Sequence, residues 1–172
     1  MNVPHFQQER EYSCLAACVR MVLAFYGDYR SEDDLRRLLK TRVTGTSPAN
    51  VMLNLPGIGF DALVFDGFQT ILRQHISEGT PCIVHLWTDP LPHWQDAVVH
   101  AVVVTDIAED TINYASADSP SQPRSPSCAR VRAAGEAEAA SGWPDPDRSE
   151  AHVPLTRLHS SAGCSIRNRI CR

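Results

Sequence analysis

A cysteine, a histidine and a glutamine have neighbours that suit them to nucleophilic catalysis. Gln8 lies six residues before Cys14, and Cys14 opens an alanine-rich run with helical periodicity. His100 begins a run of branched apolar residues, HAVVV, which is typical of a strand. A thiol at a helix start, an imidazole on a strand and a side-chain amide are the groups needed for acyl transfer through a thioester. These residues therefore predict a covalent cysteine site.

Each of these groups has a predicted role. The partial positive charge at a helix N-terminus, and a nearby imidazolium, are expected to lower the pKa of the Cys14 thiol. His100 would protonate the leaving amine and then activate water. The Gln8 amide and the Cys14 backbone N–H would hold the oxyanion, and such a donor contributes about 3 kcal/mol. On the residues alone, Gln7 is an equal candidate.

A third group must orient the imidazole, and the segment TINYASADSP offers Asn113, Ser116 and Asp118. Side chains alternate along a strand with a period of two, so Ser116 and Asp118 are expected on one side and Asn113 on the other. We choose Asp118, because a carboxylate also stabilises the imidazolium.

Composition excludes several function classes. The net charge of −4 predicts no nucleic-acid partner. No apolar run approaches the ~20 residues of a membrane span, and the N-terminus does not read as a signal peptide, so we expect a cytoplasmic protein. Cys14 and Cys18, with His85 or His100, could in principle bind zinc. Because the sequence has no second close-spaced pair of cysteines, we expect no metal and no cofactor. The sequence also shows no nucleotide-binding module, so we expect activity that does not depend on ATP.

The elements that must position these groups follow a simple order. Three helices are expected first, beginning after Ser13, Ser31 and Ser47, and Gly27 should end the first of them. A strand and an amphipathic helix follow, and then three more strands. The expected segments are 60–65, 68–79, 81–87, 98–107 and 111–115. Helices followed by an antiparallel sheet predict the α+β class.

The chain changes character near Asp118. Beyond this residue Pro, Ser, Ala and Arg dominate, and Trp143 is the sole aromatic residue. We therefore expect one domain over residues 1–118 and a poorly ordered tail over residues 119–172. One hypothesis is that this tail is a degenerate end or comes from a shifted reading frame.

Taken together, these residues resemble the bacteriocin-processing cysteine peptidase family, also called double-glycine leader peptidases. The resemblance covers roughly residues 3–120. It lies in Gln8 and Cys14 at the head of a helix ending in Phe-Tyr-Gly, in the strand from His100 to Val104, and in the GTSPANVM segment. Asp118-Ser-Pro matches the family's Asp-Pro loosely. Leu15 stands where the family commonly has glycine.

The resemblance implies a papain-like α+β fold with a Cys14–His100–Asp118 triad and Gln8 in the oxyanion hole. The best-known members are fused to an ABC exporter, whereas this chain resembles the stand-alone branch. The resemblance identifies neither the substrate, which is a peptide or a protein, nor an exporter partner. Our first hypothesis is a cysteine peptidase that hydrolyses peptide bonds. The alternatives are a catalytically impaired peptide-binding module and another acyl chemistry such as deamidation.

Overall fold

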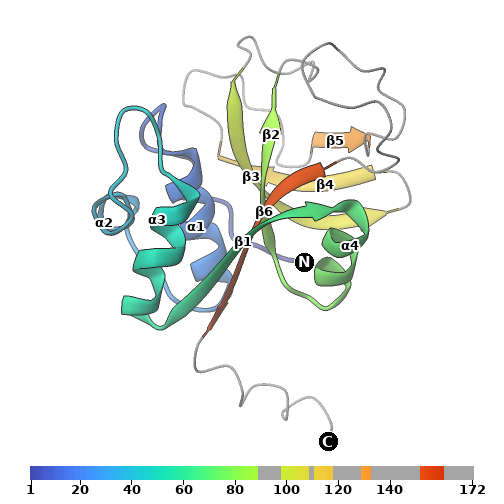
Figure 1. Cartoon of the computed structure of the whole chain (residues 1–172), viewed down its shortest axis with the longest axis horizontal. Coiled ribbons are helices and arrows are strands. Elements are labelled where there is room, and N and C mark those ends of the chain that lie inside the picture. Colours follow the sequence, from blue (N-terminus) through green and yellow to red (C-terminus); the bar gives the residue numbers. More distant parts are fainter. Residues whose placement is uncertain (89–97, 109–110, 118–128, 133–151, 161–172) are drawn as a thin grey trace, which may run out of the picture.

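Short helices precede the sheet in the computed structural model, which describes residues 1–88, 98–108, 111–117, 129–132 and 152–160. Figure 1 shows these helices together on one side of the molecule. They are α1 (Cys14–Phe25), α2 (Glu32–Leu38) and α3 (Pro48–Asn54), followed by the 3-10 turn η1 (Leu55–Ile58).

The described strands form one sheet with the order β1-β6-β2-β3-β4-β5, and every neighbouring pair is antiparallel. Helix α4 (Gln69–Ser77) connects β1 to β2. The strands are β1 (Phe60–Phe68), β2 (Cys82–Trp87), β3 (Val99–Ala108), β4 (Thr111–Ser116), β5 (Ala129–Arg132) and β6 (His152–Ser160). Helices leading into an antiparallel sheet confirm the predicted α+β class.

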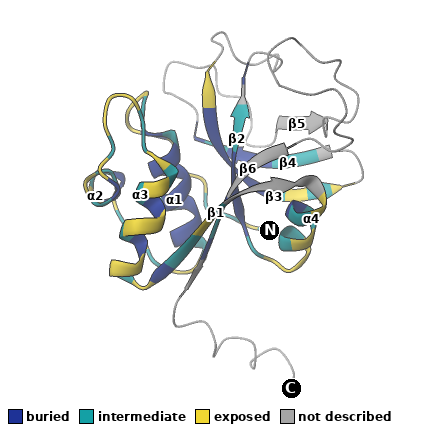
Figure 2. Ribbon diagram, in the orientation of Figure 1, coloured by how far each residue is buried: buried dark blue, intermediate teal, exposed yellow. Residues whose placement is uncertain are grey.

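Helix α1 is the most deeply buried helix segment (Figure 2). Its spacing predicted a single apolar stripe, yet nine of its residues are buried, all of them between Leu15 and Ala24. The reason is that α1 packs against α2 and also against β3. Small alanine side chains let its neighbours approach closely from more than one direction.

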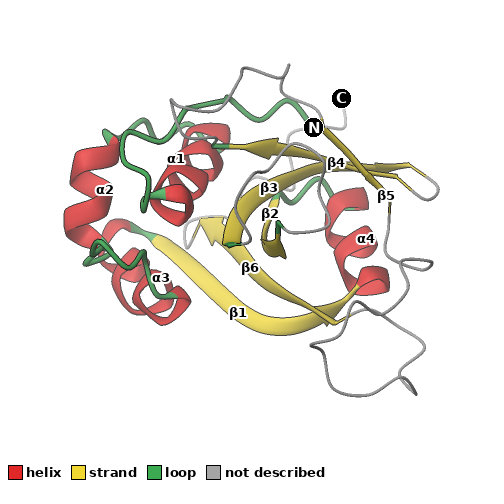
Figure 3. Ribbon diagram, turned by 90° about the horizontal axis from the view of Figure 1, so that it is seen from above, coloured by secondary structure: helices red, strands yellow, loops and turns green. Residues whose placement is uncertain are grey.

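The two faces of the sheet support separate cores. Along β3, Ala101 and Val103 belong to the core that contains α1, whereas Val102 and Val104 pack with Leu72 of α4. This alternation follows from the period of two along a strand. Figure 3 shows α4 well apart from α1, α2 and α3, so the sheet separates two helical layers.

Most of the predicted elements are present with nearly the predicted bounds. The cap at Ser31 is confirmed, because its side chain accepts a hydrogen bond from the Asp34 N–H at 3.1 Å. The segment predicted as a tail is different, since it contains two strands. Strand β5 pairs with β4, and β6 pairs with both β1 and β2. The domain boundary at residue 118 stays a prediction.

Within the described ranges, no helix combines the length and the apolar character needed to cross a bilayer.

Candidate active site

Cys14 is the first residue of α1 and is half-buried. Burial raises the pKa of the Cys14 thiol, and backbone hydrogen bonds from Ala101, Leu15 and Cys14 itself lower it only in part. The predicted lowering of this pKa is therefore wrong for the free protein, because desolvation outweighs the N–H groups at the helix start. The hydrogen bond from Ala101 brings the Cys14 sulfur to the backbone of β3.

His100 immediately precedes Ala101 on β3 and is only 5% exposed. Its Nε2 lies 3.2 Å from the Ser116 Oγ of β4. The ladder pairs Val102 with Ser116, so the hydroxyl projects from the same sheet face as His100. By the same alternation His100 shares its sheet face with Val102, which packs with α4, whereas Cys14 contacts the next residue, Ala101, whose side chain faces α1.

Gln8 is buried, with 3% of its surface exposed, whereas Gln7 is exposed. The Gln8 Nε2 donates to the Glu11 carbonyl at 3.2 Å. An amide nitrogen has a second N–H, which could donate to a developing oxyanion. Among described residues the buried Gln8 Oε1 has no hydrogen-bond partner. These contacts favour Gln8 over Gln7 as the functional glutamine.

Ser13 does not cap α1 as predicted, because its side chain makes no hydrogen bond to the helix N–H groups. Its Oγ lies instead 2.7 Å from Glu32 Oε1, a residue of α2. Sequence analysis did not identify Glu32 at all. A buried carboxylate cannot be recognised in a helix that also carries half-buried Asp33 and exposed Asp34 at neighbouring positions.

Asp118, the residue chosen to orient His100, lies outside the described residues. Ser116, which was considered and set aside for Asp118, contacts the ring. The period-two argument had placed Ser116 and Asp118 on one side of the strand, and a preference for a carboxylate then favoured Asp118.

The other described cysteines are unsuited to nucleophilic attack. Cys18 is fully buried, its Sγ donates to the Ala101 carbonyl at 3.3 Å, and its pKa is well above the usual value because of burial. Burial raises the pKa of Cys82 to about 12. Among the residues that the structure describes, no cluster of His, Cys, Asp or Glu could hold a metal ion.

Comparison with known proteins decides the family. The model of the peptidase C39 family matches residues 2–118, about two thirds of the chain. The chain belongs to the peptidase C39 family. Membership of C39, the family of double-glycine processing peptidases, supports a cysteine peptidase and bears out the resemblance stated above. No curated protein sequence matches the chain.

Two solved structures share this C39 fold. One is the peptidase domain of Streptococcus ComA, a bifunctional ABC transporter involved in quorum sensing, with a TM-score of 0.63. It is 18% identical, and the match covers 92% of this chain and 97% of that domain. The other is a double-glycine motif protease from an AMS/PCAT transporter in complex with its leader peptide. Its TM-score is 0.55 at 18% identity, with coverage of 92% and 93%. These matches confirm the papain-like α+β fold.

Proposed function

We propose that this C39 chain hydrolyses peptide bonds through a thioester on Cys14, with His100 as general acid and base. The observation that carries the proposal is the position of the Cys14 sulfur, at the start of α1 and against the backbone of Ala101. His100 is the preceding residue and is almost fully buried. The thiol and the imidazole are thereby carried by two elements that pack together, and their direct contact during the reaction is part of the proposal.

The raised pKa of Cys14 indicates how the attack begins. The resting thiol is protonated at neutral pH, so His100 takes its proton as the sulfur attacks the carbonyl carbon. An S–C bond forms, the amine leaves with the proton from His100, and a thioester remains. His100 then deprotonates a water molecule that attacks the thioester, which releases the carboxylate product and restores the thiol.

Three further residues support these steps in the proposal. Gln8 donates an amide N–H to the oxyanion together with the backbone N–H of Cys14. Ser116 orients His100 through its contact with Nε2, and the imidazole of His100 exchanges the proton with sulfur. Asp118 stays a proposed member of the triad. It directly follows Ala117, which is fully buried.

The proposed substrate is a peptide, and we keep the cytoplasm as the proposed location. The double-glycine motif protease of the AMS/PCAT transporter is bound to its leader peptide. In this chain, the Cys14 sulfur accepts a hydrogen bond from the backbone of Ala101 in β3.

The test is cleavage of a proteome-derived peptide mixture, followed by mass spectrometry of the products. Wild-type protein should yield new termini with one water added across each cut bond, and Cys14→Ala should yield none. Cys18→Ala is the matched control, since it removes a buried thiol on the same helix and should retain cleavage. Cleavage by Cys14→Ala at the wild-type rate would contradict the proposal. A mass change of about one unit in intact peptides would indicate deamidation instead.

One observation favours the alternative of a peptide-binding module that does not cut. A thiol whose pKa is raised by burial is a weak nucleophile at neutral pH unless a base assists it. A fluorescent peptide that binds the wild type and Cys14→Ala equally, and is cut by neither, would establish this alternative.

A further inference from the structure

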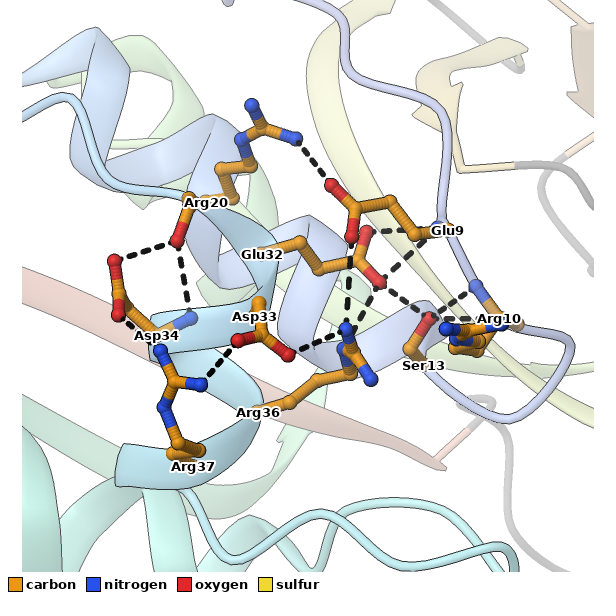
Figure 4. Close-up of polar contacts among 10 residues, drawn as sticks. Glu9, Arg10, Ser13, Arg20, Glu32, Asp33, Asp34, Arg36 and Arg37 are labelled. Carbon is orange, nitrogen blue, oxygen red and sulfur yellow. Dashed lines mark hydrogen bonds and ion pairs between the residues drawn. The ribbon is translucent and has the colours of Figure 1, made fainter.

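The loop that joins Gln8 to Cys14 is anchored on a single buried carboxylate, that of Glu32 (Figure 4). The backbone N–H of Glu9 lies 3.0 Å from both carboxylate oxygens of Glu32. The Ser13 Oγ lies 2.7 Å from Glu32 Oε1. Glu9 directly follows Gln8, and Ser13 directly precedes Cys14. Glu32 therefore holds the chain next to both groups proposed to bind the oxyanion.

The carboxylate is an unusual choice for so buried a position. Glu32 is 0% exposed, and burial raises its pKa, although the bonds from Ser13 and the Glu9 N–H act in the opposite direction. A buried charge is tolerated only where hydrogen bonds and an opposite charge compensate for lost water. Arg36 Nε at 3.6 Å from Glu32 Oε1 provides that charge.

Two arginines hold the same loop by its exposed edge. Arg20 of α1 and Arg36 of α2 each approach the Glu9 carboxylate to 3.6 Å, from different helices. Figure 4 shows the side chains of Glu9 and Glu32 lying close together between these arginines. Ser13 adds a local turn, because its hydroxyl accepts from the Arg10 N–H at 3.1 Å. The loop is thus attached to both α1 and α2.

We propose that Glu32 is a positioning residue for the oxyanion site, and this inference rests on the proposed function. Oxyanion donors act only when held within about 0.5 Å of the productive geometry. A loop fastened at Glu9 and at Ser13 has little freedom to move Gln8 relative to Cys14. Glu32 touches neither the thiol nor the imidazole in any described contact, so it acts through its two loop partners.

The decisive variant is Glu32→Gln, which keeps the size of the side chain. Its amide oxygen could keep one bond with the Glu9 N–H, but its amide nitrogen would stand 3.0 Å from the same N–H, a donor facing a donor. That repulsion should displace Glu9 and with it Gln8. Asp33→Asn is the matched control, because Asp33 also pairs with Arg36, at 2.9 Å, and has no described contact with residues 9–13. Ser13→Ala removes the hydroxyl that contacts Glu32 and keeps the carboxylate itself.

The probe is acetyl-Gly-Gly-aldehyde, whose two glycines follow the double-glycine motif that peptidases of this family process. The Cys14 sulfur adds to the aldehyde carbon, the C=O π bond breaks, and its oxygen takes the thiol proton. This oxygen occupies the oxyanion position, so affinity for the aldehyde reports on the donors. Affinity is measured as protection of Cys14 from iodoacetamide. Fragment spectra of tryptic peptide 11–20 distinguish Cys14 from Cys18.

Glu32→Gln is expected to weaken aldehyde binding at least tenfold and to alter alkylation of free Cys14 less than twofold. Asp33→Asn should change both less than twofold. Aldehyde affinity of Glu32→Gln within twofold of wild type would overturn the inference. If circular dichroism shows that Glu32→Gln is unfolded, Ser13→Ala takes its place as the test. We expect Ser13→Ala to weaken aldehyde binding about threefold, and an unchanged affinity would contradict the inference. A wild-type protein whose Cys14 the aldehyde never protects would contradict the proposed function itself.

Discussion

At the scale of single residues, the Cys14 thiol is subject to opposing influences. Its place at the start of α1 exposes it to backbone N–H groups, which favour the thiolate. Burial favours the neutral thiol and is the stronger of the two. The thiol proton must therefore be removed during the attack. His100 has to act as a general base, whereas in a preformed thiolate–imidazolium pair the proton has already been transferred.

This balance predicts how Cys14 reacts with iodoacetamide at different pH values. Because the thiol pKa is raised, the reactive thiolate is scarce at neutral pH and increases as pH rises toward that pKa. The alkylation rate of Cys14, followed by mass spectrometry, should therefore continue to rise through about pH 9. A rate that is already constant above pH 7 would show a lowered pKa and contradict this account.

A second residue-scale prediction concerns Ser116, whose Oγ lies 3.2 Å from Nε2 of His100. Ser116→Ala should lower the rate of Cys14 acylation by about tenfold and shift the midpoint of its pH profile, because the ring loses an orienting contact. Ser77→Ala, which alters an exposed serine on α4, should change neither quantity. An unchanged profile in Ser116→Ala, together with a large loss in Asp118→Asn, would assign the orienting role to Asp118 alone.

Residue types and spacing were sufficient to select Gln8, Cys14 and His100 as candidates. They were insufficient for the thiol pKa, since desolvation depends on how the sheet covers the start of α1. They also missed Glu32, whose burial against the loop at residues 9–13 is a tertiary contact between segments 19 to 23 positions apart.

At the scale of elements, α1 ends in a Schellman motif. The Gly27 N–H donates to the Ala24 carbonyl and the Asp28 N–H to the Leu23 carbonyl, each at 3.0 Å. Gly27 has a φ of +88°, in the left-handed region. The sequence predicted this end correctly, because glycine after an apolar helical run is a strong local signal.

Gly27→Ala should therefore destabilise the protein by about 1 kcal/mol, measured by urea unfolding. The cost is conformational, since an added Cβ at Gly27 would meet no atom within 4 Å. Gly57→Ala is the control, because that position is equally open and no positive φ is found there. Equal stability losses in the two variants would contradict the left-handed conformation at Gly27.

At the scale of the whole molecule, β6 connects distant parts of the sheet. It lies between β1 and β2 and pairs with both. Composition did not predict this strand, because proline is rare inside sheets and the pairing partners lie far away in sequence. Pro154 lies just outside the three residue pairs that join β6 to β2. A proline at this position is therefore compatible with the strand.

The position of β6 predicts that its core residue Leu158 matters for stability. Leu158 is 0% exposed and packs in the core that contains α1. Leu158→Ala should lower the free energy of unfolding by roughly 2–5 kcal/mol. Leu63→Ala on β1 is the control, because this leucine is 52% exposed and should cost little. Similar costs for the two variants would mean that β6 is not part of the core.

The central claim is that Cys14 and His100 act as one unit, and acetylation by p-nitrophenyl acetate tests it most directly. Release of p-nitrophenolate in a single turnover gives the rate, and the mass of tryptic peptide 11–20 locates the acetyl group. We predict acetylation at Cys14 in the wild type and a rate at least about 100-fold lower in His100→Ala. A His100→Ala rate within twofold of wild type would contradict the claim.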